Sequence, residues 1–242
     1  MTIPSHLMID HRVPYEESLD IQACMGRERA ENVRPDSLWL LEHDPVFTAG
    51  RTTGKSAWPL SEEAKEIVGI PVVRTGRGGS LTYHGPGQVV GYPIVRLRDY
   101  CPGPKRYVHM LEEVILRTLG EWKIAGRRVE RFPGVWIGID PMEKIASIGV
   151  RISHGITTHG FALNVDLDLS PFSLIVPCGI PGCRMTSMSR VLGRPVDVAA
   201  VKSSLAAAFA EVFHVGWITE SGVSGRPSGK PAMAVTVEGI GP

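Results

Sequence analysis

The thiol of Cys178 is a candidate nucleophile. It follows an apolar run and Pro177, and Gly179 comes directly after it. The proline and the glycine predict a turn, which can expose a nucleophile and supply neighbouring backbone N–H groups to an oxyanion. A lone cysteine is also commonly an inert, buried small side chain. A nucleophilic role therefore requires a partner that lowers the pKa of the thiol from about 8.5.

Lys144 is a candidate for that partner, because it begins an apolar segment that is typical of a strand. The two-residue period of a strand predicts Lys144 on the same face as Ala146 and Ile148, with Ser147 on the opposite face. Burial among mostly non-polar neighbours would lower the pKa of Lys144 and suit it to proton transfer. The alternative is an exposed lysine at a strand end, and spacing alone does not bring Lys144 to Cys178.

A glycine-rich segment, RGGSLTYHGPG at residues 77–87, is the second unusual stretch. Its glycines allow the backbone to approach a ligand closely, and its amides could bind a carbonyl or phosphate oxygen. Arg77 and His84 bracket the first glycines and favour a binding site, although a pair of tight hairpin turns is the alternative. His43 could line the same cleft or serve as a structural hydrogen-bonding residue.

A metal site has to be weighed as well. Four residues separate Cys178 from Cys183, and four separate His154 from His159, which are spacings seen among zinc ligands. The predicted strand at residues 156–165 would turn the two histidines to opposite faces, so we expect no metal. Cys183 could instead form a reversible disulfide with Cys178 on oxidation.

These candidates sit in a pattern of many strands and few helices, which predicts an α+β fold with mixed sheet(s) flanked by helices. Helices are expected at residues 14–32, 61–68 and 105–122 and from residue 197 onward. A loop is expected at residues 44–50, where Pro45 and Gly50 interrupt the chain. Strands are expected at residues 37–42, 71–74, 80–83, 88–97, 134–139, 144–152 and 156–165.

The composition argues against several classes of protein. The 242 residues are 43% hydrophobic and 21% charged, and 26 Lys and Arg face 25 Asp and Glu. This balance argues against a nucleic-acid binder, apart from the short cluster Arg127, Arg128 and Arg131. No apolar run approaches the roughly 20 residues of a membrane helix, and the first ten residues do not resemble a signal peptide. Four cysteines are too few for a disulfide scaffold, so we expect free thiols in a reducing cytosol.

The domain organisation is expected to be simple. Residues 1–218 are predicted to form one catalytic domain. Gly, Ser and Pro dominate residues 219–242, which predicts a flexible tail.

Several motifs together resemble a known family. They are LEHDPVFTAGR at 41–51, RGGSLTYHGPGQ at 77–88, KIASIGVR at 144–151, HGFALN at 159–164 and VPCGI at 176–180. Their order and spacing are similar to those of the bacterial lipoyl(octanoyl) transferases, and the resemblance covers about residues 7–215. Cys183 and the tail depart from the family pattern.

The resemblance implies a fold similar to the catalytic domain of biotin and lipoate protein ligases. It also implies that Cys178 accepts an octanoyl group as a thioester, and that Lys144 lowers the pKa of Cys178 and acts as acid and base. The residues that it implies as the lining of an acyl pocket are Arg77, Gly78, Gly79, Ser80, Leu81, Thr82, Tyr83, His84, Ser147, Ile148, Gly149, Gly160, Phe161 and Ala162.

The same resemblance implies the partners. Octanoyl–acyl carrier protein would be the donor. Lipoyl domains of 2-oxoacid dehydrogenase complexes and the glycine cleavage carrier protein would be the acceptors. No cofactor, metal, nucleic acid or membrane is expected, and the enzyme should be a cytoplasmic monomer. The alternatives are an ATP-dependent lipoate or biotin ligase, a non-enzymatic acyl- or zinc-binding module, and an inactive relative.

Overall fold

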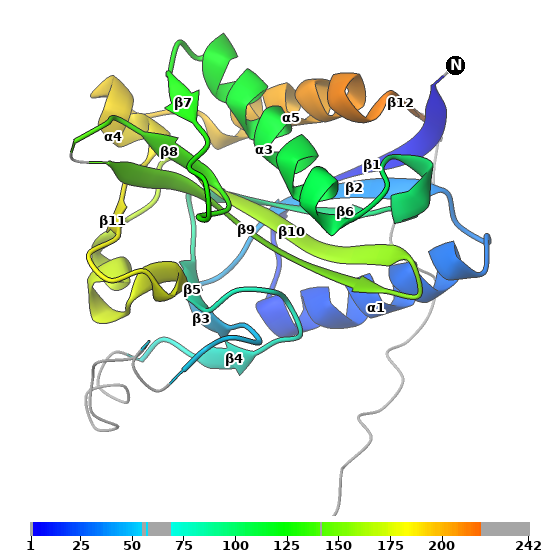
Figure 1. Ribbon diagram of the computed structural model, residues 1–242, viewed down its shortest axis with the longest axis horizontal. Coiled ribbons are helices and arrows are strands. Elements are labelled where there is room, and N and C mark those ends of the chain that lie inside the picture. Colours follow the sequence, from blue (N-terminus) through cyan, green and yellow to red (C-terminus); the bar gives the residue numbers. More distant parts are fainter. Residues whose placement is uncertain (1, 55–56, 58–68, 141, 219–242) are drawn as a thin grey trace, which may run out of the picture.

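A large mixed sheet runs through the middle of the molecule (Figure 1). The structure is a computed structural model that describes residues 2–54, 57, 69–140 and 142–218. In spatial order the large sheet consists of β12 (Val215–Trp217), β1 (Ile3–Arg12), β2 (Asp36–Glu42), β6 (Gln88–Ile94), β10 (Ile156–Asn164), β9 (Glu143–Ser153), β8 (Val135–Ile137) and β7 (Gly126–Arg127), and β11 (Arg184–Met185) pairs with β9. A smaller sheet has the order β4 (Val72–Arg74), β3 (Val46–Ala49) and β5 (Leu81–His84).

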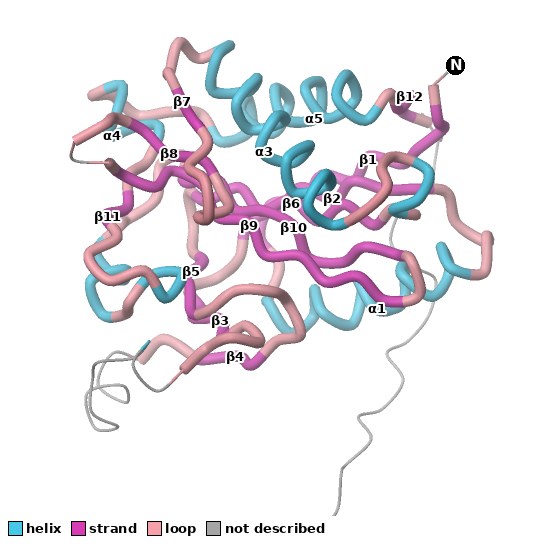
Figure 2. The backbone as a smooth tube through the Cα atoms, viewed as in Figure 1, coloured by secondary structure: helices cyan, strands magenta, loops and turns pink. Residues whose placement is uncertain are grey.

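Helices lie on both faces of the large sheet (Figures 1 and 2). Helices α3 (Pro104–Glu121) and α5 (Val198–Phe213) cover one face, and α1 (Tyr15–Ala30) lies on the other, beside the small sheet. Pro104 suits the first turn of α3, and the Asp197 side chain caps α5 by accepting from the Ala199 N–H at 2.9 Å. The shorter segments are η2 (Leu97–Asp99), η3 (Ser170–Leu174), η4 (Pro177–Gly179) and α4 (Met188–Leu192).

Strands β2 and β6 are buried along their whole length because both faces of the large sheet are covered. The two-residue period of β2 sends Leu38 and Leu40 into the core beneath α3 and α5. The same period sends Trp39 and Leu41 into the core on the α1 side, where they join Met25. The large sheet therefore separates two hydrophobic layers. Its strands β9 and β10 line the cavity described below.

Most of the predicted elements are present, and the α+β class is confirmed. The loop predicted at residues 44–50 is wrong, because Val46–Ala49 pairs with both neighbours as the middle strand of the small sheet. Strand β1 had not been predicted, since its polar residues mask the alternation. The predicted helix at residues 61–68 and the predicted tail at 219–242 lie outside the described residues.

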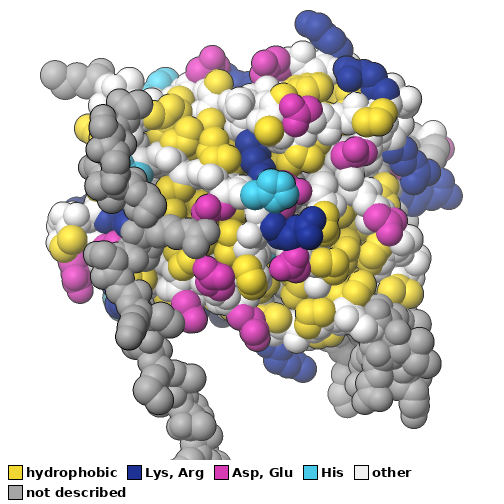
Figure 3. Space-filling view, turned by 180° about the vertical axis from the view of Figure 1, so that it is seen from behind, with side chains coloured by type: hydrophobic (Ala, Val, Ile, Leu, Met, Phe, Trp, Pro, Cys, Tyr) yellow, Lys and Arg dark blue, Asp and Glu magenta, His cyan; other side chains and the backbone are white. Residues whose placement is uncertain are grey.

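The described surface carries mixed charges. On the face opposite to that of Figure 1, acidic and basic side chains are interspersed among hydrophobic ones (Figure 3). None of the helices in the described ranges combines the length and the hydropathy that crossing a membrane requires.

A buried ion pair joins α5 to the sheet and generates the first prediction. Lys202 Nζ lies 2.9 Å from Glu42 Oε1 and donates to the Asp10 carbonyl at 3.0 Å, and Glu42 Oε2 accepts from the Gly87 amide at 2.9 Å. Lys202→Met should lower the free energy of unfolding by about 3–5 kcal/mol, because it leaves the Glu42 carboxylate buried without a cation. Urea unfolding measures this loss, and adding Glu42→Gln should restore part of it. A loss below about 1 kcal/mol, typical of exposed pairs, would contradict the assignment.

Candidate active site

A cavity of about 470 Å³ opens between the glycine-rich segment, β9, β10 and the η4 turn. The residues predicted from the sequence that line it are Arg77, Gly78, Gly79, Ser80, Leu81, Thr82, His84, Lys144, Ser147, Ile148, Gly149, Gly160, Phe161, Ala162 and Cys178. Segments far apart in the chain thus meet around one hollow, which is large enough for a small organic group.

Lys144 and Cys178 lie in contact on the wall of this cavity. Lys144 Nζ lies 3.4 Å from Cys178 Sγ and donates to the Pro133 carbonyl at 2.9 Å. The Trp136 ring centroid lies 5.0 Å from the same nitrogen, and only 2% of Lys144 is exposed. Ser147 Oγ lies 3.6 Å from the sulfur. The amine and the sulfur are therefore close enough for a proton to pass between them.

The face predicted for Lys144 is wrong, and a β-bulge is the reason. On β8, Val135 pairs with Ala146 and Trp136 pairs with Lys144, which leaves Ile145 without a partner. Ile145 and Ala146 are both buried in the core beneath α3 and α5. The extra residue shifts the strand period by one, so Lys144 and Ser147 reach Cys178 from the same side.

The backbone at Cys178 has a conformation that is rare for a residue with a side chain. Cys178 has φ 58° and ψ 12°, and Gly179 follows at φ 69°. Such conformations cost of order 1–3 kcal/mol and cluster at functional sites. The sequence correctly predicted a turn here, and the half-buried thiol is directed toward Lys144.

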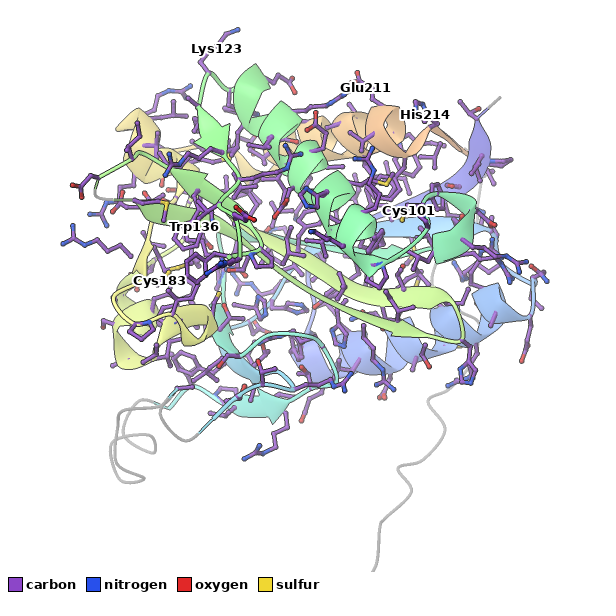
Figure 4. All side chains as sticks on the ribbon, viewed as in Figure 1. Cys101, Lys123, Trp136, Cys183, Glu211 and His214 are labelled. Carbon is purple, nitrogen blue, oxygen red and sulfur yellow. The ribbon has the colours of Figure 1, made fainter. Side chains whose placement is uncertain are left out.

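Cys183 has a different environment from Cys178. Burial, and to a smaller extent Cys178, raise the pKa of Cys183 to about 11, so its thiol is protonated at neutral pH. Figure 4 labels Cys183 and Trp136, which lie at the end of the large sheet where β8 and β11 are found. The four cysteines are free thiols.

Arg77 is a buried cation on the cavity wall. Its Nη2 donates to Thr48 Oγ1 at 2.9 Å, Thr48 lies 3.2 Å from His84 Nε2, and His84 Nδ1 lies 2.6 Å from Gln88 Oε1. The glycine at position 149 permits the close approach of this loop to β9, since a Cβ there would lie 2.8 Å from the Gly78 carbonyl oxygen. Among the described residues, no carboxylate lies within ion-pairing distance of Arg77.

A cluster of histidines and tyrosines lies behind Arg77. His43 Nδ1 donates to the Val13 carbonyl at 2.7 Å, so its Nε2 accepts from the Tyr92 hydroxyl at 2.7 Å. Burial lowers the pKa of His43 to about 4 and the pKa of His159 to about 4. Burial also lowers the pKa of His84. The rings are therefore neutral at pH 7, and His43 is a hydrogen-bonding residue that does not reach the cavity.

The structure differs from the predicted lining at one residue. The side chain of Tyr83 packs away from the cavity, with its ring centroid 5.4 Å from Phe47 and 5.7 Å from Phe172. The predicted site did not include the cavity residues Tyr15, Val90, Tyr92, Val108, Arg131, Phe132, Pro133, Val150, His159, Gly179 and Ile180. Val150, His159, Gly179 and Ile180 lie inside the quoted motifs, whereas the others come from helices, loops and neighbouring strands without a motif.

The alternative of a zinc site requires several metal-ligating side chains to lie close together. In the described ranges, no three His, Cys, Asp or Glu side chains are grouped as a metal ion would require. His154 lies in the exposed turn between β9 and β10, whereas His159 is buried beside the cavity.

Comparison with known proteins places this chain in a family. Residues 14–210 match the lipoyl protein ligase A/B catalytic domain. The chain belongs to this family. An octanoyltransferase from Myxococcus xanthus is 40% identical over 234 residues, which cover 96% of this chain and 64% of that protein. An octanoyltransferase from Alkaliphilus metalliredigens is 43% identical over 204 residues, which cover 84% of this chain and 92% of that protein.

Solved structures of lipoate protein ligases have the same fold. A bi-partite lipoate protein ligase from Thermoplasma acidophilum gives a TM-score of 0.68 at 16% identity, covering 90% of this chain and 87% of that one. The predicted similarity to lipoate ligases in fold and to octanoyltransferases in sequence is confirmed. The chain spans less than two thirds of the length of the Myxococcus relative.

The neutral histidines predict how stability responds to acid. The pKa of His43 is about 4 when folded and near 6.5 when unfolded, so its contribution is complete above pH 6.5 and is lost as pH falls toward 4. His43→Gln should therefore reduce the loss of unfolding free energy between pH 6.5 and pH 4 by about 3 kcal/mol. Urea unfolding across this pH range measures it, with His154→Gln as an exposed control. Equal pH slopes in the wild type and His43→Gln would contradict the assignment.

Proposed function

We propose that this protein transfers an octanoyl group from octanoyl–acyl carrier protein to a lysine of lipoyl domains, through a thioester on Cys178. The observation that carries the proposal is the 3.4 Å approach of Lys144 Nζ to Cys178 Sγ on the wall of an acyl-sized cavity. The relatives named octanoyltransferase support the acyl group and the reaction.

The first half-reaction forms the acyl-enzyme. The Cys178 thiolate attacks the carbonyl carbon of the donor thioester, and backbone amides beside the turn and the glycine-rich segment stabilise the developing oxyanion. The bond between the carbonyl carbon and the carrier sulfur then breaks. The carrier leaves as a thiol with a proton from the Lys144 ammonium, which leaves Lys144 as a neutral amine.

The second half-reaction returns the enzyme to its starting state. The amine of an acceptor lysine attacks the Cys178 thioester, and the neutral Lys144 amine takes the proton that the nucleophile loses. Cys178 leaves as a thiolate beside the restored Lys144 ammonium. A thioester is thereby exchanged for an amide, which is downhill and requires no ATP.

The apolar part of the cavity suits an octanoyl chain. The hydrophobic side chains that line it include Val90, Ile148, Phe161 and Ala162. Each buried methylene contributes roughly 0.8 kcal/mol, so selectivity between neighbouring chain lengths should be modest and set by the depth of the slot. We further propose that the acceptors are the lipoyl domains of 2-oxoacid dehydrogenase complexes and the glycine cleavage carrier protein. The proposed location is the cytoplasm, and the proposed state is a monomer.

An ATP-dependent ligase is the second candidate, because the fold is shared with lipoate protein ligases. Such an enzyme activates a free acid as an adenylate and has no use for a nucleophilic thiol. The buried lysine and the cavity are compatible with either reaction, whereas the contact between Lys144 and Cys178 favours the transferase.

The two candidates predict opposite responses to one substitution. With octanoyl–acyl carrier protein and a lipoyl domain, the wild type should form octanoylated lipoyl domain without ATP. Cys178→Ala should lower that rate by at least about a thousandfold, because it removes the covalent route. Cys183→Ala is the matched control and should retain activity. Mass spectrometry of the lipoyl domain measures the product. If Cys178→Ala octanoylates the domain from free octanoate and ATP, the protein is a ligase.

A further inference from the structure

A buried carboxylate behind Lys144 has no part in the mechanism above. Glu112 lies on α3 and is 4% exposed. Its Oε1 accepts from the Gly134 amide at 3.0 Å, and its Oε2 lies 3.2 Å from Arg128 Nε and 3.7 Å from His109 Nδ1. A buried carboxylate is costly unless it is hydrogen-bonded and paired. These contacts therefore tie the loop before β8 firmly to the helix.

The loop held by Glu112 lies directly against the Lys144 side chain. Gly134 has φ 121°, and a Cβ at this position would lie 2.8 Å from Lys144 Cε and 2.4 Å from the Ala146 carbonyl oxygen. The Pro133 carbonyl, on the other side of the same peptide unit as the Gly134 N–H, accepts from Lys144 Nζ at 2.9 Å. One rigid peptide group thus connects Glu112 to the ammonium.

We propose that Glu112 is a positioning residue for Lys144. By holding the Gly134 amide it fixes the Pro133 carbonyl, and that carbonyl aims the Lys144 ammonium at the sulfur of Cys178. The inference rests on the proposed function only in taking Lys144 and Cys178 as the reacting pair. Arg128 holds the Glu112 carboxylate in place through its Nε, which lies 3.2 Å from Glu112 Oε2.

A positioning role is distinguishable from a purely structural one by the reactivity of the thiol. The charged and titratable groups that act on Cys178 are Lys144, Arg77 and Cys183. Those beside Glu112 are Arg128 and His109. A structural role would change the unfolding free energy and leave the pH dependence of Cys178 alkylation unchanged.

The test is the rate of alkylation of Cys178 by iodoacetamide between pH 5 and pH 10, followed by peptide mass spectrometry of the full chain. Lys144→Met should react about tenfold more slowly than the wild type at neutral pH, because the lysine amine no longer stabilises negative charge on the attacking sulfur. Glu112→Ala should be slower by a similar factor. The double variant should be no slower than Lys144→Met, because both substitutions remove the same interaction. If the rate reductions of the two single variants multiply in the double variant, the proposal is overturned.

Two conservative variants distinguish the position of the Glu112 side-chain oxygen from the charge of the carboxylate. Glu112→Gln keeps an oxygen for the Gly134 amide and should react within about twofold of the wild type. Glu112→Asp keeps the charge but withdraws the oxygen, and should react about fivefold more slowly. The reverse order, or a wild-type rate for Glu112→Asp, would overturn the proposal even if Glu112→Ala does not fold. Glu113→Ala is the control, since Glu113 contacts Arg128 at 2.7 Å and is 37% exposed in its side chain.

Failure of the proposed function gives a different result. In that case the wild type would show the fast, Lys144-dependent alkylation and yet take up no octanoyl group from octanoyl–acyl carrier protein. The comparison of Glu112 variants by alkylation would still decide the role of Glu112.

Discussion

The contact between the buried Lys144 amine and the Cys178 sulfur is the interaction around which this end of the structure is organised. A buried charge is costly unless its hydrogen bonds and counter-charge are supplied by fixed groups. Lys144 obtains them from the Pro133 carbonyl, the face of Trp136 and the thiol of Cys178. Pro133 and Trp136 come from β8 and the loop before it, and Cys178 comes from the η4 turn, so the amine is fixed only when β8, β9 and the η4 turn have assembled.

The covered sheet supplies the rigidity that this arrangement needs. Strand β9 pairs with β10 on one side and with β8 on the other, and α3 packs against it. The bulge at Ile145 turns two consecutive side chains into the core and frees Lys144 to face the cleft. The strained turn at Cys178 completes the pair from a loop, where a residue can reach the cavity without distorting the sheet.

How much the sequence could predict depended on whether a feature is local. The helices, most strands and the turn at Cys178 follow from periodicity, proline and glycine, which act over a few residues. The bulge could not be predicted, because it is defined by the pairing of Lys144 and Ala146 with a partner strand. The short strand Val46–Ala49 was missed because punctuating residues flank it. Glu112 stands beside Glu113 in the sequence and resembles an exposed helix acid until the Gly134 amide is seen against it.

The thioester on Cys178 is tested most directly by the intact mass of the protein after mixing with octanoyl–acyl carrier protein alone, without acceptor or ATP. We expect one octanoyl group per chain, released by hydroxylamine and mapped to the peptide containing Cys178, and no adduct on Cys178→Ala. An unmodified wild-type protein under conditions that support octanoylation of a lipoyl domain would contradict the thioester, as would an adduct mapped to another residue.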